Sequence, residues 1–547
     1  MGAVQFAAAG GRPRRGVVPG RSFLWPSSIS VVGVIAVWRF GLRGPDIPAQ
    51  LYISELFRTH GWLLWDNGWY GGHYQASYSV LFAPLAAGVG LYGAALLCGA
   101  TATWAFARLV VVAGHRRQVV PVLLFAVGTV IAVAIGQLPF LAGEAAGLLA
   151  LVAARRDRTA LALLFAASCG LFSEVAGVFL VLATAAWVLT SPSERRRKVF
   201  VFGVAAVLPM VVLSAALPRL GPFPFSLATL SVILGVSAVG ILAFPTRYRI
   251  VRVGLALYAA ASVVVFVVPN PLGGNIGRLA AYFAPPLAAF LATIPGRRVI
   301  GAFVVPLLMW QYVPALGALR TDASAAASYS APVVDFLARQ PLVGRLEIPF
   351  TRGHWEAAYV APRVALARGW LRQLDTLDNP LFYSNRALSA ASYHRWLVEN
   401  GITWIALPDV ALDYSAVTEA HLLATGLPYL RPVWRNAHWR VWTVVDSPGL
   451  VSGPARITKL EPNRVSLAAT GTGSVLVRVR YTPMWNVTGG RACITEHHGV
   501  WTRLEVLRAG PIELTTSLLP TRTDCDIRAP SNLVAAPAGP DALRPAR

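Results

Sequence analysis

The chain has 547 residues, a mean hydropathy of +0.56, 55% apolar residues and only 13% charged ones. This composition is too apolar for a water-soluble protein of this size, and it predicts a protein whose main partner is the lipid bilayer. The net charge of +23 would suit nucleic acid only if it formed a solvated basic face. Because the charges stand in small clusters between apolar runs, we expect no nucleic-acid partner.

Charge and composition divide the chain near residue 320. Residues 1–319 carry 24 basic and 7 acidic residues, whereas residues 320–547 carry 24 basic and 18 acidic ones. We predict a disordered basic cytoplasmic N-terminus at 1–22 and a multi-pass α-helical transmembrane domain at 23–319. Beyond it we predict an α/β domain at 320–446, a β-sandwich at 447–537 and a disordered tail at 538–547.

About eleven apolar stretches are candidate membrane spans, although several are shorter than the ~20 residues that a full crossing needs. Basic clusters fall in every second connection, at 115–117, 155–158, 194–198, 247–252 and 297–298. This positive-inside pattern places the N-terminus in the cytoplasm and, with an odd number of spans, the C-terminal region outside. No convincing small-x-small cleavage site follows the first stretch, so we expect an uncleaved helix rather than a signal peptide. The stretches are 23–42, 88–113, 119–136, 139–154, 159–173, 175–190, 199–217, 226–244, 253–268, 279–295 and 299–317.

Five of the seven acids of the membrane domain map to the predicted outer face, at positions 46, 55, 66, 144 and 174. Placing a carboxylate beside hydrocarbon costs free energy, so such an acid is usually retained for function. Gly44-Pro45 would end the first helix and present Asp46 at the membrane surface, ahead of helical spacing from Gln50 to Arg58. The alternative is that Asp46 only caps that helix, and that Asp66 only caps the turn Asp66-Asn67-Gly68.

The first exterior loop, residues 43–77, is unusually aromatic. Its aromatic cluster is either a belt at the membrane interface or a platform for a sugar. On the second interpretation, the substrate-binding candidates are Gln50, Trp69, Tyr70 and His73.

A second patch, Pro269 to Arg278, lies on the same predicted face. Its glycines, exposed N–H groups and single Arg at a helix N-terminus suit an anionic group such as a phosphate. Asn275 and Arg278 are therefore candidate ligands, and the alternative is a simple turn followed by a snorkelling Arg.

Other motifs are absent or ambiguous. The sequence has no Walker A loop, no GxGxxG that follows a strand and no zinc-type Cys/His spacing. Cys98 and Cys169 lie in apolar runs, whereas Cys493 and Cys525 could form a disulfide in the C-terminal region. Turn signals at 461–463, 471–473 and 489–490 separate its predicted strands. Groups that often bind sugars gather in 353–356, in 367–370 and at Asp375, Asp378 and Tyr383, although core packing explains them equally well.

An acid soon after the first helix, the motif Trp65-Asp66-x-x-Trp69-Tyr70-x-Gly72, short paired helices and an exterior C-terminal region together resemble polytopic GT-C glycosyltransferases. The resemblance covers residues 23–317, and residues 44–78 are similar to bacterial membrane proteins grouped with that class. It implies a multi-pass protein of the bacterial plasma membrane. Its implied reaction moves a sugar from a polyprenyl-phosphate donor to an envelope glycan or lipid acceptor.

The resemblance also implies roles for single residues. By position, Asp46 matches the catalytic base and Glu144 the assisting acid, while Asp66 would orient the acceptor or the base. Arg278 would hold the leaving phosphate, with inversion at the sugar. The chain lacks the adjacent Asp-Asp or Asp-Glu pair of several such families, which leaves a divalent metal cofactor open.

The competing prediction is a non-catalytic protein: a transporter, flippase or scaffold subunit of envelope assembly. Inverted sequence repeats or charges in mid-span would favour it, and neither is clear in the sequence.

Overall fold

The computed structural model describes residues 25–75, 79–111, 119–217, 221–383 and 388–518. The predicted N-terminal segment 1–22 and tail 538–547 lie outside them, as do residues 76–77 of the first exterior loop. Internal contacts divide the chain into two units: residues up to Leu450 together with Glu461–Asn463, and residues Val451–Leu460 together with those from Arg464 onward.

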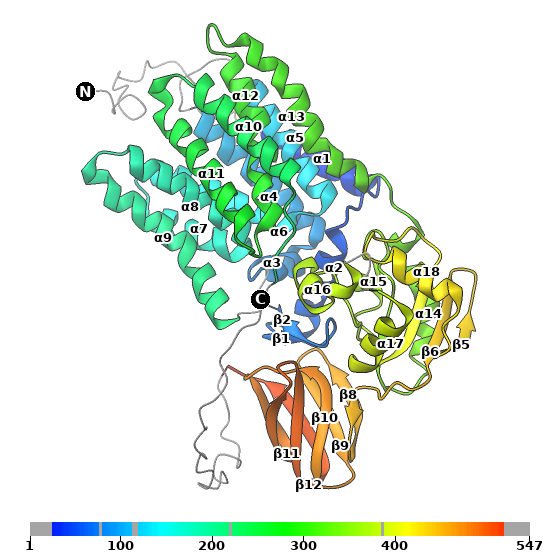
Figure 1. Cartoon of the computed structure of the whole chain (residues 1–547). Coiled ribbons are helices and arrows are strands. Elements are labelled where there is room, and N and C mark those ends of the chain that lie inside the picture. Colours follow the sequence, from blue (N-terminus) through cyan, green and yellow to red (C-terminus); the bar gives the residue numbers. More distant parts are fainter. Residues whose placement is uncertain (1–24, 76–78, 112–118, 218–220, 384–387, 519–547) are drawn as a thin grey trace, which may run out of the picture. The chain divides into compact units, whose positions relative to one another are not determined.

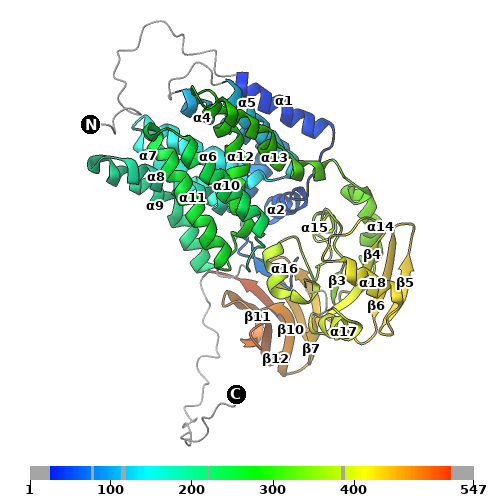
Figure 2. The same cartoon turned by 45° about the horizontal axis from the view of Figure 1, so that its top comes forward.

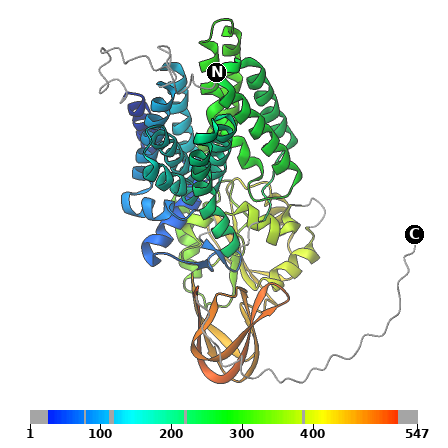
Figure 3. The same cartoon turned by 90° about the vertical axis from the view of Figure 1, so that its left-hand side faces the viewer.

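Each of the eleven predicted stretches contains an α-helix, and these helices run alongside one another in Figures 1 and 3. We call this part of the first unit, residues 25–318, the helical region. The helices are α1 (Trp25–Arg39), α4 (Leu91–Val111), α5 (Val119–Ile135), α6 (Leu138–Arg155), α7 (Thr159–Phe172), α8 (Glu174–Thr190), α9 (Ser193–Ala216), α10 (Leu227–Ala243), α11 (Arg249–Val267), α12 (Arg278–Ala292) and α13 (Val304–Ala318).

Five helical segments of the described residues are long and apolar enough to cross a membrane: 91–110, 138–155, 193–216, 246–267 and 298–318. Four further apolar helices are shorter, at 119–135, 159–172, 174–190 and 227–243. These helices indicate a membrane protein. The number of eleven spans and the orientation stay predictions.

Helix α6 is the most buried of the five long segments, with 83% of its apolar window inside the protein. It packs against α4, α7 and α8. Small residues allow this close approach, since a Cβ at Gly143 would lie only 2.7 Å from that of Ala176 on α8. Helix α6 therefore carries Glu144 into the centre of the helical region.

Between α1 and α4 the chain forms α2 (Ile47–His60), α3 (Phe82–Val89) and the short antiparallel pair β1 (Trp65–Asp66) and β2 (His73–Tyr74). The loop before α2 packs directly on the end of α5. The backbone N–H of Gly44 donates to the carbonyl of Ala134 over 2.9 Å, and that of Asp46 donates to Ile135 over 3.1 Å. A Cβ at Gly44 would lie 2.4 Å from the carbonyl oxygen of Ile135, so glycine is required there.

Residues 323–450, here called the α/β region, contain a four-stranded sheet in the order β3-β4-β6-β5. The strands are β3 (Arg345–Glu347), β4 (Ile402–Pro408), β5 (Leu430–Arg435) and β6 (Trp439–Val444). Helix α14 (Ala327–Leu337) shares a core with one face of the sheet, and α17 (Ala390–Glu399) and α18 (Val417–Thr425) share one with the other (Figure 2). Short helices α15 (Glu356–Tyr359) and α16 (Arg372–Asp378) were not predicted.

The second unit is rich in strands. Strands β7 (Val451–Ser452), β8 (Ala455–Glu461), β9 (Arg464–Ala469), β10 (Gly473–Arg480), β11 (Trp485–His497) and β12 (Trp501–Thr516) form one six-stranded sheet, with β12 paired to β9, β10 and β11. Its description as a sandwich stays a prediction.

One predicted turn in this unit is wrong. Gly489 and Gly490 lie inside β11, where the register against β12 shifts and Gly490 has φ +81°. Glycine here serves a bulge rather than a chain reversal. Cys493 lies in β11, and its predicted partner Cys525 is outside the described residues. Cys98 and Cys169 are buried free cysteines.

Candidate functional site

Asp46 stands at the N-terminus of α2, but it does not cap that helix. Its side chain accepts no capping hydrogen bond from the helix backbone, and it remains partly accessible, with 16% of the side chain exposed. Pro48 at the start of α2 supplies the helical φ and has no N–H to satisfy. The carboxylate of Asp46 is therefore available for another role.

Arg278 lies beside Asp46, although the two residues are far apart in the sequence. A guanidinium nitrogen of Arg278 is 3.8 Å from a carboxylate oxygen of Asp46, an ion pair too long for a hydrogen bond. Burial raises the pKa of Asp46 above its ordinary value, and the positive charges of Arg278 and His354 partly offset that rise. The structure thus brings together the predicted base and the predicted phosphate ligand.

Arg278 is the first residue of α12, and its guanidinium lies over the ring of Phe140, 5.5 Å from the centroid. A cation at this position reinforces the partial positive charge of the helix N-terminus, which favours an anion. The glycines ahead of it have a packing role. Cβ atoms at Gly273 and Gly274 would lie 2.1 Å and 2.9 Å from the carbonyl oxygens of Phe223 and Pro224. Asn275 is partly buried in this turn.

A large cavity opens among the helices next to this pair. Its volume is about 1620 Å³, larger than the ~300–1,000 Å³ of an ordinary small-molecule site. Phe140, over whose ring the guanidinium of Arg278 lies, and Leu279, the residue after Arg278, line the cavity at this end, and Arg155 lines it at the far end of α6. From Phe140 to Arg155 the helix rises about 22 Å, so the cavity extends along most of a membrane crossing.

Glu144 lines the same cavity one helical turn beyond Phe140. It is only 7% exposed, and neither carboxylate oxygen has a hydrogen-bond partner among the described residues. A buried acid without partners is costly, which points to a ligand group that would complete its hydrogen bonds.

Other predicted site residues of the first loop are packed inside the protein. Asp66 is fully buried and accepts hydrogen bonds from the Tyr52 hydroxyl over 2.7 Å and from the Gly68 N–H over 2.9 Å. Trp69, also fully buried, stacks on Tyr52 and on His73 with ring centroids 4.4 Å and 5.4 Å apart. These contacts support the turn and the loop core, so we do not place these residues in the proposed site.

The loop also anchors the α/β region. The Tyr70 hydroxyl donates to the carbonyls of Gly369 and of Leu371, the latter over 2.9 Å. Trp370 Nε1 donates to the carbonyl of Pro45 over 2.8 Å, directly before Asp46. Tyr70 is therefore a structural anchor, and the α/β region borders the site.

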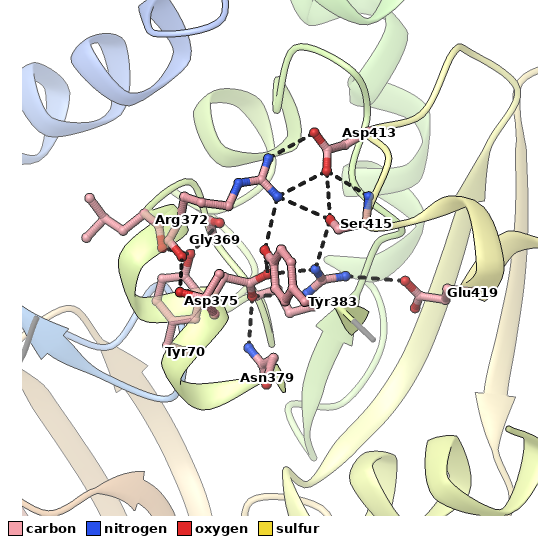
Figure 4. A network of polar contacts seen from close by, with 12 residues as sticks. Tyr70, Gly369, Arg372, Asp375, Asn379, Tyr383, Asp413, Ser415 and Glu419 are labelled. Carbon is pink, nitrogen blue, oxygen red and sulfur yellow. Dashed lines mark hydrogen bonds and ion pairs between the residues drawn. The ribbon is translucent and has the colours of Figure 1, made fainter. Parts of the chain in front are cut away.

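Two arginines organise the acids of the α/β region (Figure 4). Arg368 is buried and binds Asp375 through two hydrogen bonds of 3.1 Å and 2.6 Å, with Glu419 at 3.5 Å. Arg372 binds Asp413 over 2.9 Å. Asp375, for which sugar binding was one interpretation, belongs to this internal network.

The α/β region also contributes His354, which the sequence did not select as a site residue. His354 Nε2 lies 3.7 Å from Asp413 and 3.3 Å from Arg372, while Nδ1 lies 3.6 Å from Glu356. Burial alone would raise the pKa of Asp413, but hydrogen bonds with His354 and Arg372 outweigh it and hold that pKa well below its ordinary value. The only sequence signal was the density of polar and aromatic residues at 353–356.

Neither a protein-family model nor a curated protein sequence matches this chain. The described residues contain no cluster of three or more His, Cys, Asp or Glu side chains that could hold a metal ion. Fold and site together define a helical membrane protein with an Asp–Arg pair beside a large internal cavity.

Proposed function

We propose that this protein is a membrane glycosyltransferase that moves a sugar from a polyprenyl-phosphate donor to an envelope acceptor outside the membrane. The observation that carries the proposal is the Asp46–Arg278 pair at 3.8 Å, with the guanidinium of Arg278 over Phe140, which lines a cavity of about 1620 Å³. An acid, a cation and a long apolar cavity are the three elements that this reaction requires.

The cavity suits the lipid part of the donor. Most of its lining residues are apolar, and it follows α6 for about 22 Å, the scale of a bilayer leaflet and more. A polyprenyl chain bound there would bring its phosphate to the end bordered by Phe140 and Leu279. Arg278 then stands where the phosphate arrives.

Arg278 would stabilise the leaving phosphate. Its guanidinium is not hydrogen bonded to Asp46 at 3.8 Å, so it can exchange that weak ion pair for a charge-assisted contact with phosphate oxygens. As the bond between the anomeric carbon and the phosphate oxygen breaks, the phosphate keeps the electron pair and gains negative charge. A cation placed there lowers the barrier because it acts where charge develops.

Asp46 would act as the base. It accepts the proton of the acceptor hydroxyl while that oxygen forms the new bond to the anomeric carbon, opposite the departing phosphate. A single displacement inverts the configuration of the sugar.

The first test is release of polyprenyl phosphate from labelled polyprenyl-phosphate sugars by purified protein, with and without extracted envelope acceptors. Asp46→Asn should lower turnover at least ~100-fold, since it removes a general base, without changing the yield of folded protein. Glu55→Gln is the matched control, because Glu55 lies on the same helix and only pairs with the exposed Arg58. Normal turnover of Asp46→Asn would remove Asp46 from the mechanism.

The same cavity supports a second candidate, a lipid flippase or transporter. Arg155, Arg195 and Arg247 line its far end, so charged groups stand at both ends of one apolar passage. Turnover separates the two functions. Folded wild-type protein that binds lipid-linked sugars but releases no polyprenyl phosphate from any donor would favour the flippase.

A further inference from the structure

Helices α2 and α15 and the residues next to them carry three buried polar groups that lack a hydrogen-bond partner among the described residues. Helix α15 packs against α2, and Trp355, directly before it, lies in the same core as Ile47, directly after Asp46. Gln50 Nε2, His354 Nδ1 and Glu356 Oε1 have no hydrogen-bond partner among the described residues. Their side chains belong to residues only 1%, 6% and 3% exposed.

Such groups are costly unless a ligand pairs them. An unpaired buried polar atom costs about 1–3 kcal/mol, and charged groups cost more. Gln50 stands one helical turn after Asp46, so both side chains lie on the same face of α2. His354 is close enough for its charge to act on Asp46. Gln50 and His354 are therefore near the proposed base, and Glu356 lies 3.6 Å from His354.

The surrounding structure holds His354 in an unfavourable backbone conformation. His354 has φ +55°, a left-handed conformation that is unfavourable for a residue with a side chain. Its ring packs on Phe350, 4.4 Å between centroids, and Thr351 fixes the neighbouring Glu356 through a 2.6 Å hydrogen bond to Oε2. These contacts hold His354 Nδ1 and Glu356 Oε1 3.6 Å apart, so that one hydroxyl oxygen can reach both.

The chemistry of the three groups selects the ligand. Gln50 Nε2 donates, the Glu356 carboxylate accepts, and a histidine nitrogen does either according to its tautomer. Hydroxyl groups both donate and accept and carry no charge, whereas a phosphate would be repelled by Glu356. We propose that Gln50, His354 and Glu356 bind the hydroxyl groups of an uncharged sugar or polyol beside Asp46. The proposal rests on the proposed function for the identity of Asp46 as the base.

The hydroxyls could belong to the sugar of the donor or to the acceptor, and two assays on full-length protein in nanodiscs distinguish them. The first measures the Kd for a polyprenyl-phosphate hexose and for polyprenyl phosphate without sugar. The second measures the KM for extracted envelope acceptor. The variants are Glu356→Gln and His354→Gly, and the matched control is His394→Gln, an exposed histidine of the same region that pairs with Asp446.

His354→Gly relieves the left-handed backbone but also removes the contacts with Phe350 and Asp413, so its Tm is measured beside that of Glu356→Gln. If the site holds the donor sugar, both variants should weaken binding of the sugar-linked lipid at least 10-fold and leave the bare lipid unchanged. If it holds the acceptor, the Kd stays constant and the acceptor KM rises at least 10-fold. Changes below 2-fold in both assays, or equal losses for both lipids, would overturn the proposal.

Failure of the proposed function gives a different result. Wild-type protein without turnover can still prefer the sugar-linked lipid over the bare one, and loss of that preference in Glu356→Gln would support the sugar site alone. Wild-type protein without turnover and without such a preference would overturn both proposals.

Discussion

At the residue scale, the positive charge of Arg278 lowers the pKa of Asp46. Burial raises the pKa of this carboxyl and Arg278 partly offsets the rise, so removal of the guanidinium should raise that pKa further. A base must be ionised to act, and turnover therefore falls as the pH drops through the pKa of Asp46.

Arg278→Gln should accordingly shift the acidic limb of the kcat/KM profile to higher pH and lower the maximum turnover. Arg278→Lys should restore the position of the limb, because it restores the charge, but only part of the turnover, because an ammonium lacks the planar fork for phosphate. The pH profile of polyprenyl phosphate release checks this, with the exposed Arg297→Gln as control. If the acidic limb of the kcat/KM profile does not shift in Arg278→Gln, Arg278 does not set the pKa of Asp46.

Also at the residue scale, two tryptophans of one loop have different surroundings. Trp69 is fully buried and stacked between Tyr52 and His73, whereas Trp62 is 58% exposed. Loss of a buried tryptophan side chain costs about 3–5 kcal/mol, so Trp69→Ala should lower the Tm by several degrees while Trp62→Ala leaves it nearly unchanged. Thermal unfolding in detergent measures both. If Trp69→Ala leaves the Tm unchanged but abolishes sugar binding, Trp69 is a substrate-binding residue rather than a core residue.

At the scale of elements, strand β3 carries a buried acid whose pKa is raised. Glu347 is fully buried, its oxygens lack hydrogen-bond partners other than the neighbouring Glu419, and one guanidinium, Arg368, faces both acids as well as Asp375. Burial raises the pKa of Glu347 well above its ordinary value and that of Glu419 to about 7, and the charge of Asp375 raises both further.

The sign of the resulting pH dependence follows from linkage. The folded pKa lies above the unfolded value of about 4.3, so the stabilising contribution is complete below that value and is lost as the pH rises through the folded pKa. Glu347→Gln keeps the shape without the charge, and it should raise the Tm at pH 8 relative to the wild type and flatten the decline between pH 5 and 8. Exposed Glu399→Gln is the control. A lower Tm of Glu347→Gln at pH 8 would mean that the carboxylate is ionised in the fold.

At the scale of the whole molecule, the site argument depends on which side of the membrane holds the α/β region. Arginine clusters at alternate connections predict that residue 198 lies in the cytoplasm and residue 320 outside. An alkaline phosphatase fused after Arg320 should be active and one fused after Lys198 inactive, with fluorescent-protein fusions giving the reverse. An active phosphatase after Lys198 would place Asp46 in the cytoplasm and exclude an exterior acceptor.

Local sequence patterns were sufficient to predict the helices of the helical region. Apolar runs located helices α1 and α4 to α13. A segment in lipid must pair its backbone N–H and C=O groups within the helix and present apolar side chains to the hydrocarbon. Asp46 and Arg278 could be selected together because charge alternation assigns both to one predicted face, and no contact needed to be known.

Tertiary structure decided what periodicity cannot encode. Whether Asp46 caps α2, whether Trp69 is a platform or core, and whether Gly490 turns or bulges depend on what segments distant in the chain place against each residue. His354 and Glu356 are the clearest case, since the packing of α15 on α2 brings His354 near Asp46 and leaves one polar atom of each residue without a hydrogen-bond partner. The sequence by itself determined the helices, strands and candidate charges. The tertiary structure decided which of those charges meet, because burial and pairing are properties of contacts between segments.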